Sequence, residues 1–103
     1  MRVDLYGHVS ARTTDVSQLV AATLSVDFSP NECPQRRTTY YRAYWRLVDD
    51  LTVHANTFDL DGTLIEPEFP DFPTLVYVAG ANEATERLLD DVPGLTLLRT
   101  ESL

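Results

Sequence analysis

The sequence contains no lysine, and its eight basic residues are all arginines. Its one cysteine, Cys33, cannot form an internal disulfide and cannot build a structural zinc site by itself. No run of about 18 apolar residues is present, and the first residues lack the apolar stretch of a secretory signal. The chain also lacks a G-x-G-x-x-G loop for phosphate. These absences favour a soluble cytoplasmic protein that needs no cofactor.

The length and the charge of the chain limit its class. With 103 residues, of which 44% are hydrophobic, we expect residues 1–103 to form a single domain with its own core. The formal charge of −8 is uneven, because residues 1–46 carry +2 and residues 47–103 carry −10. Nucleic-acid binding requires a basic surface, so this balance argues against it and favours a basic protein partner.

The first third of the chain predicts a strand, a helix and a loop. Residues 2–6 alternate in the period of a half-buried strand. Apolar side chains then recur at helical spacing, and Asp15 and Gln18 match a capping box, so we predict a helix from about 15 to 25. Residues 29–35 contain two prolines and little apolar content, which predicts an exposed loop.

The middle of the chain predicts an antiparallel meander. Residues 38–48 are β-branched and aromatic, with one apolar face and one face that alternates Tyr with Arg. A turn at Asp49-Asp50 leads into a strand at 51–58, and Asp61-Gly62 is a strong hairpin signal before a short strand at 63–65. A bulge within one long hairpin is the alternative for the last of these segments.

The last third of the chain predicts a connector, a strand, a helix and a strand. Residues 66–73 contain three prolines that cannot donate ladder hydrogen bonds, so they should form an extended connector. Residues 75–78 predict a strand, Asn82 caps a second helix, and residues 95–99 predict a final strand. The order β-α-β-β-β-α-β predicts an α+β fold with two helices on one face of a mostly antiparallel sheet, a variant of the ferredoxin-like plait.

The string from Phe58 to Leu64, FDLDGTL, resembles the DxDGT signature of the haloacid-dehalogenase-like phosphohydrolases. That resemblance implies Asp59 as the nucleophile and Asp61 as the general acid/base, with Mg²⁺ offsetting their charge. The family places the motif after a strand of a large parallel sheet, and the residues that follow it here are too few to complete such a sheet. Residues 47–71 also hold seven acids and no basic residue, so a phosphate ester would meet a repulsive surface. A solvated Asp-Gly turn is the alternative interpretation.

Other catalytic or metal chemistry has less support in the sequence. With Asp59 counted as the first position, Gly62 stands at the fourth, whereas an EF-hand loop has its glycine at the sixth. His8, His54 and Cys33 are far apart and have no zinc-site spacing. No serine lies in a G-x-S-x-G elbow. The cysteine follows an acidic residue, and a neighbouring negative charge disfavours a reactive thiolate. We therefore predict no catalytic residue and no metal ligand.

Two surfaces remain as candidate binding sites. One is the Tyr and Arg row of the strand predicted at 38–48, because these two residue types are enriched at protein interfaces. The other is an acidic tract with two phenylalanines among prolines. The residues predicted to bind a partner are Tyr40, Arg42, Tyr44, Arg46, Asp49, Asp50, Asp59, Asp61, Glu66, Glu68, Phe69, Asp71 and Phe72. One alternative is that a helix covers one of the two faces of this strand while Tyr rings shield the Arg stems. The other is that the phenylalanines tuck beneath the connector.

The sequence thus favours a non-enzymatic acidic domain that masks a basic protein partner. In size, acidity and simplicity the chain is similar to toxin-neutralising immunity proteins and other small inhibitors, which implies a toxin as one class of partner. One alternative is a small-molecule-binding or regulatory domain that dimerises through an edge strand. A second alternative is an Mg-dependent phosphohydrolase. We expect no nucleic-acid or membrane partner, and a monomer or a weak homodimer.

Overall fold

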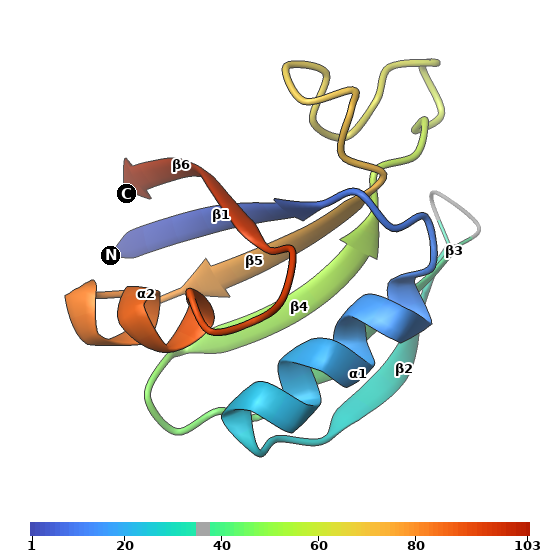
Figure 1. The fold of residues 1–103 in the computed structure, drawn as a ribbon. Coiled ribbons are helices and arrows are strands. Elements are labelled where there is room, and N and C mark those ends of the chain that lie inside the picture. The colour runs from blue at the N-terminus through green and yellow to red at the C-terminus, as the bar shows by residue number, and fades with distance from the viewer. Residues whose placement is uncertain (35–37) are drawn as a thin grey trace.

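A computed structural model describes residues 1–34 and 38–103 of the chain. The six strands form one antiparallel sheet in the order β2-β3-β4-β5-β1-β6, and both helices lie on one face of it (Figure 1). The predicted α+β fold is confirmed. Along the chain, the elements are β1 (Arg2–His8), α1 (Thr13–Leu24), β2 (Phe28–Cys33), β3 (Thr38–Ala43), β4 (Asp50–Ala55), β5 (Thr74–Ala79), α2 (Glu83–Leu89) and β6 (Thr96–Ser102).

The strand order is that of a ferredoxin-like plait whose meander is lengthened by two strands. A plait joins its two helices through one hairpin, whereas here the four strands β2 to β5 lie between α1 and α2. Each strand of this meander pairs with the next one along the chain. The first strand, β1, then lies between β5 and β6, which makes β2 and β6 the two edges of the sheet. Within the described residues, no helix is long and apolar enough to cross a membrane.

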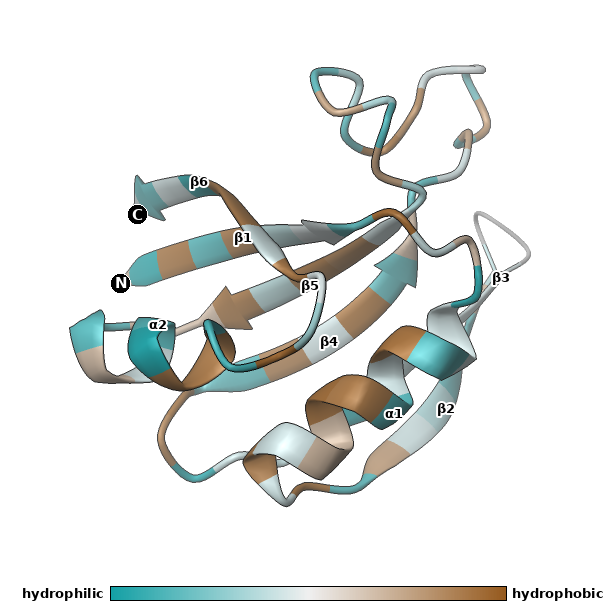
Figure 2. Cartoon of the chain, viewed as in Figure 1, coloured by the Kyte–Doolittle hydropathy of each residue, from teal (hydrophilic) through white to brown (hydrophobic). Residues whose placement is uncertain are grey.

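The main core lies between the helices and the sheet, and its apolar residues concentrate on α1 and on the central strands (Figure 2). The helices contribute Val16 and Val20 of α1 and Leu89 of α2 to this core, and all three side chains are fully buried. Half of the strand residues in this core are valines, whose β-branched side chains suit a pleated, buried surface. Its strand members with the lowest exposure are Tyr6, Leu51, Val53, Val76 and Val78.

The central strand β1 departs from its predicted half-buried pattern. Residues 4–8 are all buried, because β1 has a strand on each side and is covered on both faces of the sheet. Asp4 is fully buried among polar partners, since Arg2 donates two hydrogen bonds to it and Thr100 donates a third. Burial is the main cause that raises the pKa of the Tyr6 phenol well above its ordinary value.

In the first half of the chain, one loop prediction is wrong and one strand prediction is confirmed only in part. The segment 29–35, predicted as a loop, contains most of β2, and Gln35 lies outside the described residues. Proline is tolerated there because β2 is an edge strand, so Pro30 can turn its missing N–H away from the ladder. The strand predicted at 38–48 ends at Ala43, and the chain then turns towards β4.

The predictions after β3 are partly confirmed. The strand predicted at 51–58 ends at Ala55. The strand predicted at 63–65 is reduced to one isolated bridge between Phe58 and Leu64. Residues 66–73 connect two strands without joining the sheet, as predicted, but they are not extended, because turns close where Phe69 and Phe72 donate to the carbonyls of Glu66 and Phe69. The strand predicted at 75–78 is confirmed within β5. The last strand, predicted at 95–99, extends to Ser102 as β6.

The two helices begin differently from one another. The Asn82 side chain accepts a hydrogen bond from the Thr85 N–H, and the Thr85 hydroxyl accepts one from the Asn82 N–H, so the predicted cap of α2 is confirmed. The capping box predicted for α1 is wrong, because its N-cap is Arg12, which makes no side-chain cap. Asp15 already belongs to the first turn, where it forms an ion pair with Arg12.

Candidate functional site

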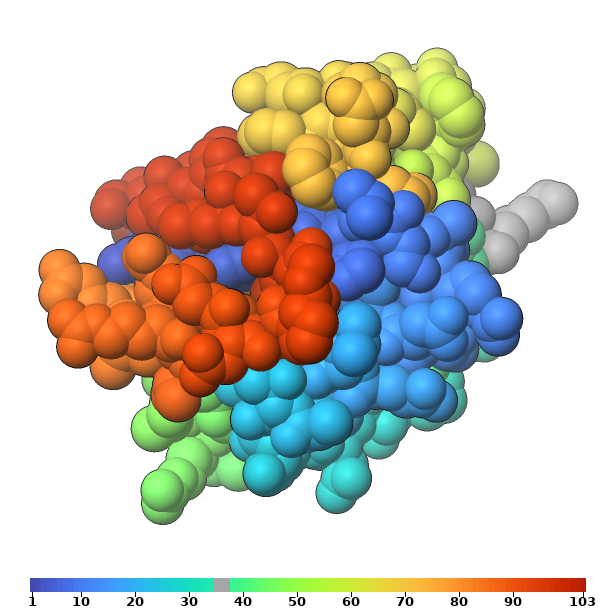
Figure 3. Space-filling model, in the orientation of Figure 1, coloured from blue at the N-terminus to red at the C-terminus, as the bar shows by residue number. Residues whose placement is uncertain are grey.

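The segment 56–73 between β4 and β5, here called the acidic loop, extends beyond one end of the sheet (Figures 1 and 3). Part of it also folds back over the helix-free face. There Phe72 approaches Gly7 so closely that a Cβ added to the glycine would lie 2.6 Å from the Phe72 ring. The neighbouring Leu5 and Leu75 are buried on that face although they do not belong to the helix-side core. The loop thus covers the β5-β1-β6 half of a face that no helix covers.

The Asn56 side chain closes the base of the acidic loop. Its amide donates to the carbonyl oxygens of Glu66 and Phe69, and its oxygen accepts from the Glu66 N–H at 3.0 Å. The Asn56 N–H also donates to the carbonyl of Pro73. One side chain therefore binds three backbone groups of the returning chain, which fixes the shape of the loop.

Glu66 attaches the loop to the sheet through what we call the Glu66 anchor, formed with Arg99 of β6 and Tyr77 of β5. Arg99 donates two hydrogen bonds to the carboxylate at 2.9 and 3.0 Å, and the Tyr77 hydroxyl donates a third at 2.7 Å. Burial by itself raises the pKa of Glu66, but the hydrogen bonds from Arg99 and Tyr77 outweigh it, so the net pKa is lowered. Glu66 is only 8% exposed. The prediction that it belongs to an exposed acidic surface is therefore wrong.

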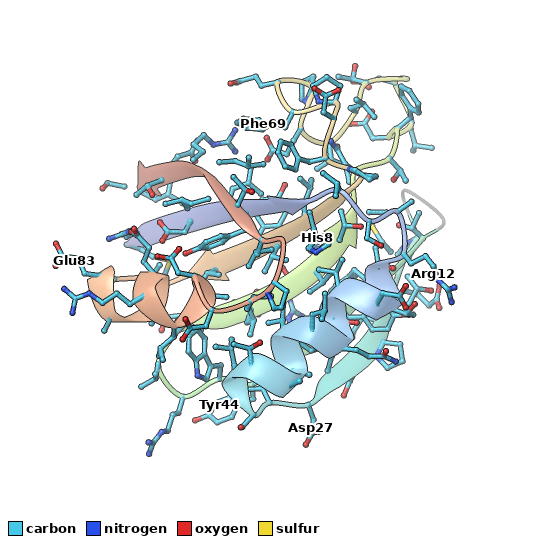
Figure 4. The ribbon with its side chains drawn as sticks, in the orientation of Figure 1. His8, Arg12, Asp27, Tyr44, Phe69 and Glu83 are labelled. Atoms are coloured by element: carbon cyan, nitrogen blue, oxygen red, sulfur yellow. The ribbon has the colours of Figure 1, made fainter. Side chains whose placement is uncertain are left out.

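The two phenylalanines of the loop are tucked inward, as the alternative interpretation held. The Arg99 guanidinium lies 5.9 Å from the centre of the Phe69 ring, and Phe69 faces the β6 side of the sheet (Figure 4). Phe72 packs against Gly7 and beside Leu98. These rings fix the loop to the sheet, since apolar side chains between prolines are costly to leave in water.

The tip of the loop is a turn built by its own carboxylates. Asp59 accepts a hydrogen bond from the Asp61 N–H, and Asp61 accepts one from the Thr63 N–H at 2.9 Å. Gly62 has a φ of 84°, which favours glycine, and its N–H donates to the Asp59 carbonyl. Contact with the Asp59 side chain and then the Thr63 N–H lower the pKa of Asp61. The predicted Asp-Gly turn is thus present, in a loop rather than in a regular hairpin.

The same tip exposes two large apolar side chains that the sequence analysis did not select. Phe58 is 65% exposed and Leu60 is 83% exposed, and they alternate with Asp59 and Asp61. One signal in the sequence could have indicated this exposure. Both residues lie in or next to an Asp-Gly turn, where the chain reverses and a side chain has no apolar surface nearby to pack against. Glu68 and Asp71 are exposed on the same loop.

The Tyr–Arg row does not form one straight face. Tyr40 and Arg42 lie on β3, but Tyr44 and Arg46 follow the end of the strand. On the helix-free face, the Tyr40 ring stacks on His54 with 4.8 Å between ring centres, and His54 meets Tyr77 edge-on at 5.4 Å. Because α1 packs on the other face of β3, the alternative that a helix covers one of the two faces is confirmed, and no helix covers the face of Tyr40 and Arg42. It remains open over β2, β3 and β4.

The charged groups of this open face pair with one another. Arg42 forms a two-point ion pair with Asp50 and lies 5.5 Å from the centre of the Tyr40 ring. Hydrogen bonding to Asp50 is the first cause that raises the pKa of Arg42. Asp49 lies instead against Gly80 at the end of β5. The two aspartates are therefore at the opposite end of β4 from the acidic loop.

A groove of about 430 Å³ lies at that opposite end, below the C-terminal end of α1 (Figure 4). Tyr44 is 86% exposed and, with Arg46, lines this groove. Tyr44 also borders a second hollow beside Arg42 and Asp50. The apolar lining of the groove was not predicted, because it combines residues from three separate segments. The other side chains that contribute are Leu24, Val26, Trp45, Leu47 and Leu88.

The residues considered for metal or phosphate chemistry do not assemble into such a site. Among the described residues, no group of three His, Cys, Asp or Glu side chains is close enough to hold a metal ion. His8 is buried and accepts from the Ser10 N–H, while its other ring nitrogen lies 3.0 Å from the Pro93 carbonyl. The parallel sheet implied by the phosphohydrolase resemblance is also contradicted, because every strand pair here is antiparallel.

No protein-family model, no curated protein and no solved structure matches this chain. The site that its own geometry distinguishes is the tip of the acidic loop. It is the place where exposed apolar side chains, exposed carboxylates and an internally bonded backbone coincide.

Proposed function

We propose that this chain is a non-enzymatic acidic domain that binds and masks a basic protein through the tip of the acidic loop. The observation that carries this proposal is the exposure of Phe58 and Leu60 between the carboxylates of Asp59 and Asp61. Apolar side chains surrounded by charges of one sign fit a partner with an apolar pocket and a rim of the opposite sign. A basic toxin is one class of partner that such a surface would mask.

The distribution of ion pairs supports a basic partner. The arginines Arg2, Arg12, Arg42 and Arg99 are each paired with a carboxylate of the chain itself. The carboxylates of Asp59, Asp61, Glu68 and Asp71 form no ion pair within residues 1–34 and 38–103. Their field remains available to steer an oppositely charged protein into contact.

The internal bonds of the loop support binding rather than mere solvation. A partner that binds a flexible loop must order it, at a cost of about 0.5–1.5 kcal/mol for each immobilised side chain. Asn56 and Glu66 already hold the backbone on both sides of the tip. Because the backbone beside the tip is already held in place, a partner that binds the tip has less of the loop to order.

The proposal is tested by binding kinetics on a panel of small basic nucleases, with the chain immobilised. For a nuclease that binds, the double variant Asp59→Asn/Asp61→Asn should slow association about tenfold, and the effect should shrink at raised ionic strength. Phe58→Ala/Leu60→Ala should instead accelerate dissociation. The matched control is Asp90→Asn/Asp91→Asn, which removes two exposed charges beyond the end of α2. Association that ignores ionic strength, or equal effects of the two charge variants, would contradict the proposal.

The groove beside Tyr44 favours a second function, the binding of a small apolar molecule. Its volume of about 430 Å³ falls within the range of ligand sites, and Trp45 and Leu88 contribute apolar surface. A thermal-shift screen with small metabolites tests it. A ligand whose stabilising effect disappears in Tyr44→Ala supports this function, whereas the absence of any shift removes it.

The phosphohydrolase alternative has its own test. If Asp59 were a nucleophile, Mg²⁺-dependent phosphatase activity would be lost in Asp59→Asn. Activity that this substitution leaves unchanged would exclude the alternative. The binding experiment is independent of this outcome, because it measures association rather than turnover.

A further inference from the structure

The two edges of the sheet differ in how well they are protected. A sheet edge presents unpaired N–H and C=O groups, and natural proteins block such edges with proline. β2 contains Pro30, whereas β6 has no proline in its seven residues. Figure 3 shows the C-terminal half of β6 at the surface, in red. β6 is therefore the edge on which another strand could pair.

The hydrogen bonds near the termini show which backbone groups of β6 face outward. Met1 and Leu103 exchange both of their backbone hydrogen bonds, so they form a hydrogen-bonded pair. Such pairs alternate along an antiparallel ladder. Within the pairs Arg2–Ser102 and Asp4–Thr100, the backbone groups of the two residues are therefore not hydrogen-bonded to each other. The carbonyl of Arg2 agrees with this, because it accepts from Gly80 and Ala81 on the other side of β1.

It follows that the N–H and C=O groups of Thr100 and Ser102 point away from β1, towards the open edge. Thr100 through Ser102 are exposed. Arg99 and Glu101, which flank Thr100, both project from the helix-free face, since Arg99 reaches Glu66 there and its Nε lies 2.9 Å from Glu101. The edge thus carries one positive and one negative side chain, two residues apart on one face.

We propose that β6 pairs with β6 of a second copy, antiparallel and in a register centred on Thr100. In this register the two Thr100 residues form a hydrogen-bonded pair, as their outward backbone groups require. Arg99 then lies opposite Glu101 of the second copy, and Glu101 opposite Arg99 of the second copy. Residues in such non-hydrogen-bonded pairs have Cα atoms about 4.5 Å apart, so both ion pairs can form. The sequence of the edge is therefore complementary to itself.

The expected dimer is weak. The contact involves one strand edge with few large side chains, and interfaces below about 1,200 Å² belong to transient complexes. The register shift in the β1–β6 ladder between Leu5 and Tyr6 also confines regular pairing to the C-terminal half of β6. The acidic loop tip remains free in such a dimer, so this inference does not depend on the proposed function.

Sedimentation equilibrium over a range of protein concentrations tests the dimer. Glu101→Arg places like charges opposite each other, so the dissociation constant should rise at least tenfold. The matched control is Asp27→Arg, which makes the same change of net charge at an exposed site before β2, far from β6 (Figure 4). Because both variants reduce the overall self-repulsion, a weaker dimer in Glu101→Arg alone would identify the edge rather than the net charge.

Two further variants test the register itself. In a Cys33→Ser background, Thr100→Cys should be captured as a dimer by a short thiol–thiol cross-linker. Ser102→Cys should not be captured, because the two copies of that residue lie four positions apart along the pairing. Circular dichroism of each variant checks that the fold is retained.

A monomer at every concentration would overturn the proposal and leave the edge to an extended peptide of another protein. A dimer that Glu101→Arg leaves unchanged would also overturn it, since another surface would then hold the copies together. Efficient cross-linking through position 102 but not through position 100 would refute the register.

Discussion

The helix-free face of the sheet is divided into two halves that differ in what covers them. Over β5, β1 and β6, the acidic loop buries Leu5 and Leu75 and attaches itself through the Glu66 anchor. Over β2, β3 and β4, the face is open. There Tyr40 stacks on His54, and Arg42 lies over the Tyr40 ring and forms an ion pair with Asp50. The same sheet therefore uses apolar burial on one half and mutual contacts of polar and aromatic groups on the other.

This difference gives a physical reason for the proposed binding residues to lie on a loop. A small domain gains stability from every covered apolar residue, and the loop acts as a partial third layer over the central strands. Because its inner side is attached to the sheet, its outer side is presented in a fixed shape. The open half has no loop attached to it that could present side chains in the same way.

The largest difference between the halves should appear on truncation of Leu75. This residue is fully buried beneath the loop, so Leu75→Ala should lower the free energy of unfolding by about 2–5 kcal/mol. On the open half, Tyr40→Ala should lower it by about 1 kcal/mol, because mainly its stacking on His54 is lost. Urea denaturation measures both values. If both substitutions lowered the free energy of unfolding equally, the loop would not form an apolar core with the sheet.

A smaller effect is expected from crowding the contact between the loop and β1. In Gly7→Ala, the new Cβ would lie 2.6 Å from the Phe72 ring and 2.7 Å from Leu98, so the loop must shift at a cost of about 1–3 kcal/mol. Hydrogen exchange should then accelerate in residues 56–73. The control is Gly62→Ala, which meets no atom within 4 Å and bears only the strain of its φ of 84°, about 1 kcal/mol. If both variants loosen the loop equally, the proposed covering contact is absent.

The smallest effect, and the most specific, concerns the Glu66 anchor. Glu66→Gln should lower the free energy of unfolding at neutral pH by about 1–2 kcal/mol, because the charged hydrogen bonds from Arg99 are weakened. The folded pKa of Glu66 is below its ordinary value of 4.5, so its contribution is complete above that pH. It is lost as the pH falls further, through the folded pKa. Urea denaturation of both proteins should therefore converge at acid pH, and a constant difference would contradict the anchor.

Local signals in the sequence were sufficient where an element depends on its own residues. β5 and the capped start of α2 follow from an apolar run and from the pair Asn82 and Thr85, which bond within one turn. The signals failed for β2, since Pro30 is acceptable only because that strand became an edge. They also failed beyond Ala43, where the β-forming pattern continues but the chain turns back into β4.

The candidate site divides in the same way. The Asp-Gly turn at the tip forms from contacts among residues 59–63, so the sequence could predict it. The burial of Glu66 could not be predicted, because its partner Arg99 is 33 residues away and meets it only when β6 lies beside β1. The exposure of Leu60 likewise depends on where the folded loop stands relative to the sheet.

By itself, the sequence determined the α+β class, the acidic character of the second half and the turn chemistry of the loop, because composition and contacts between near neighbours are sufficient for these properties. Only the tertiary structure decided which carboxylates are paired, which apolar side chains remain outside and which sheet edge is left open. Those properties depend on contacts between residues that are distant in the chain. Such contacts form only when the strands pair in the sheet, so their free energies cannot be inferred from neighbouring residues.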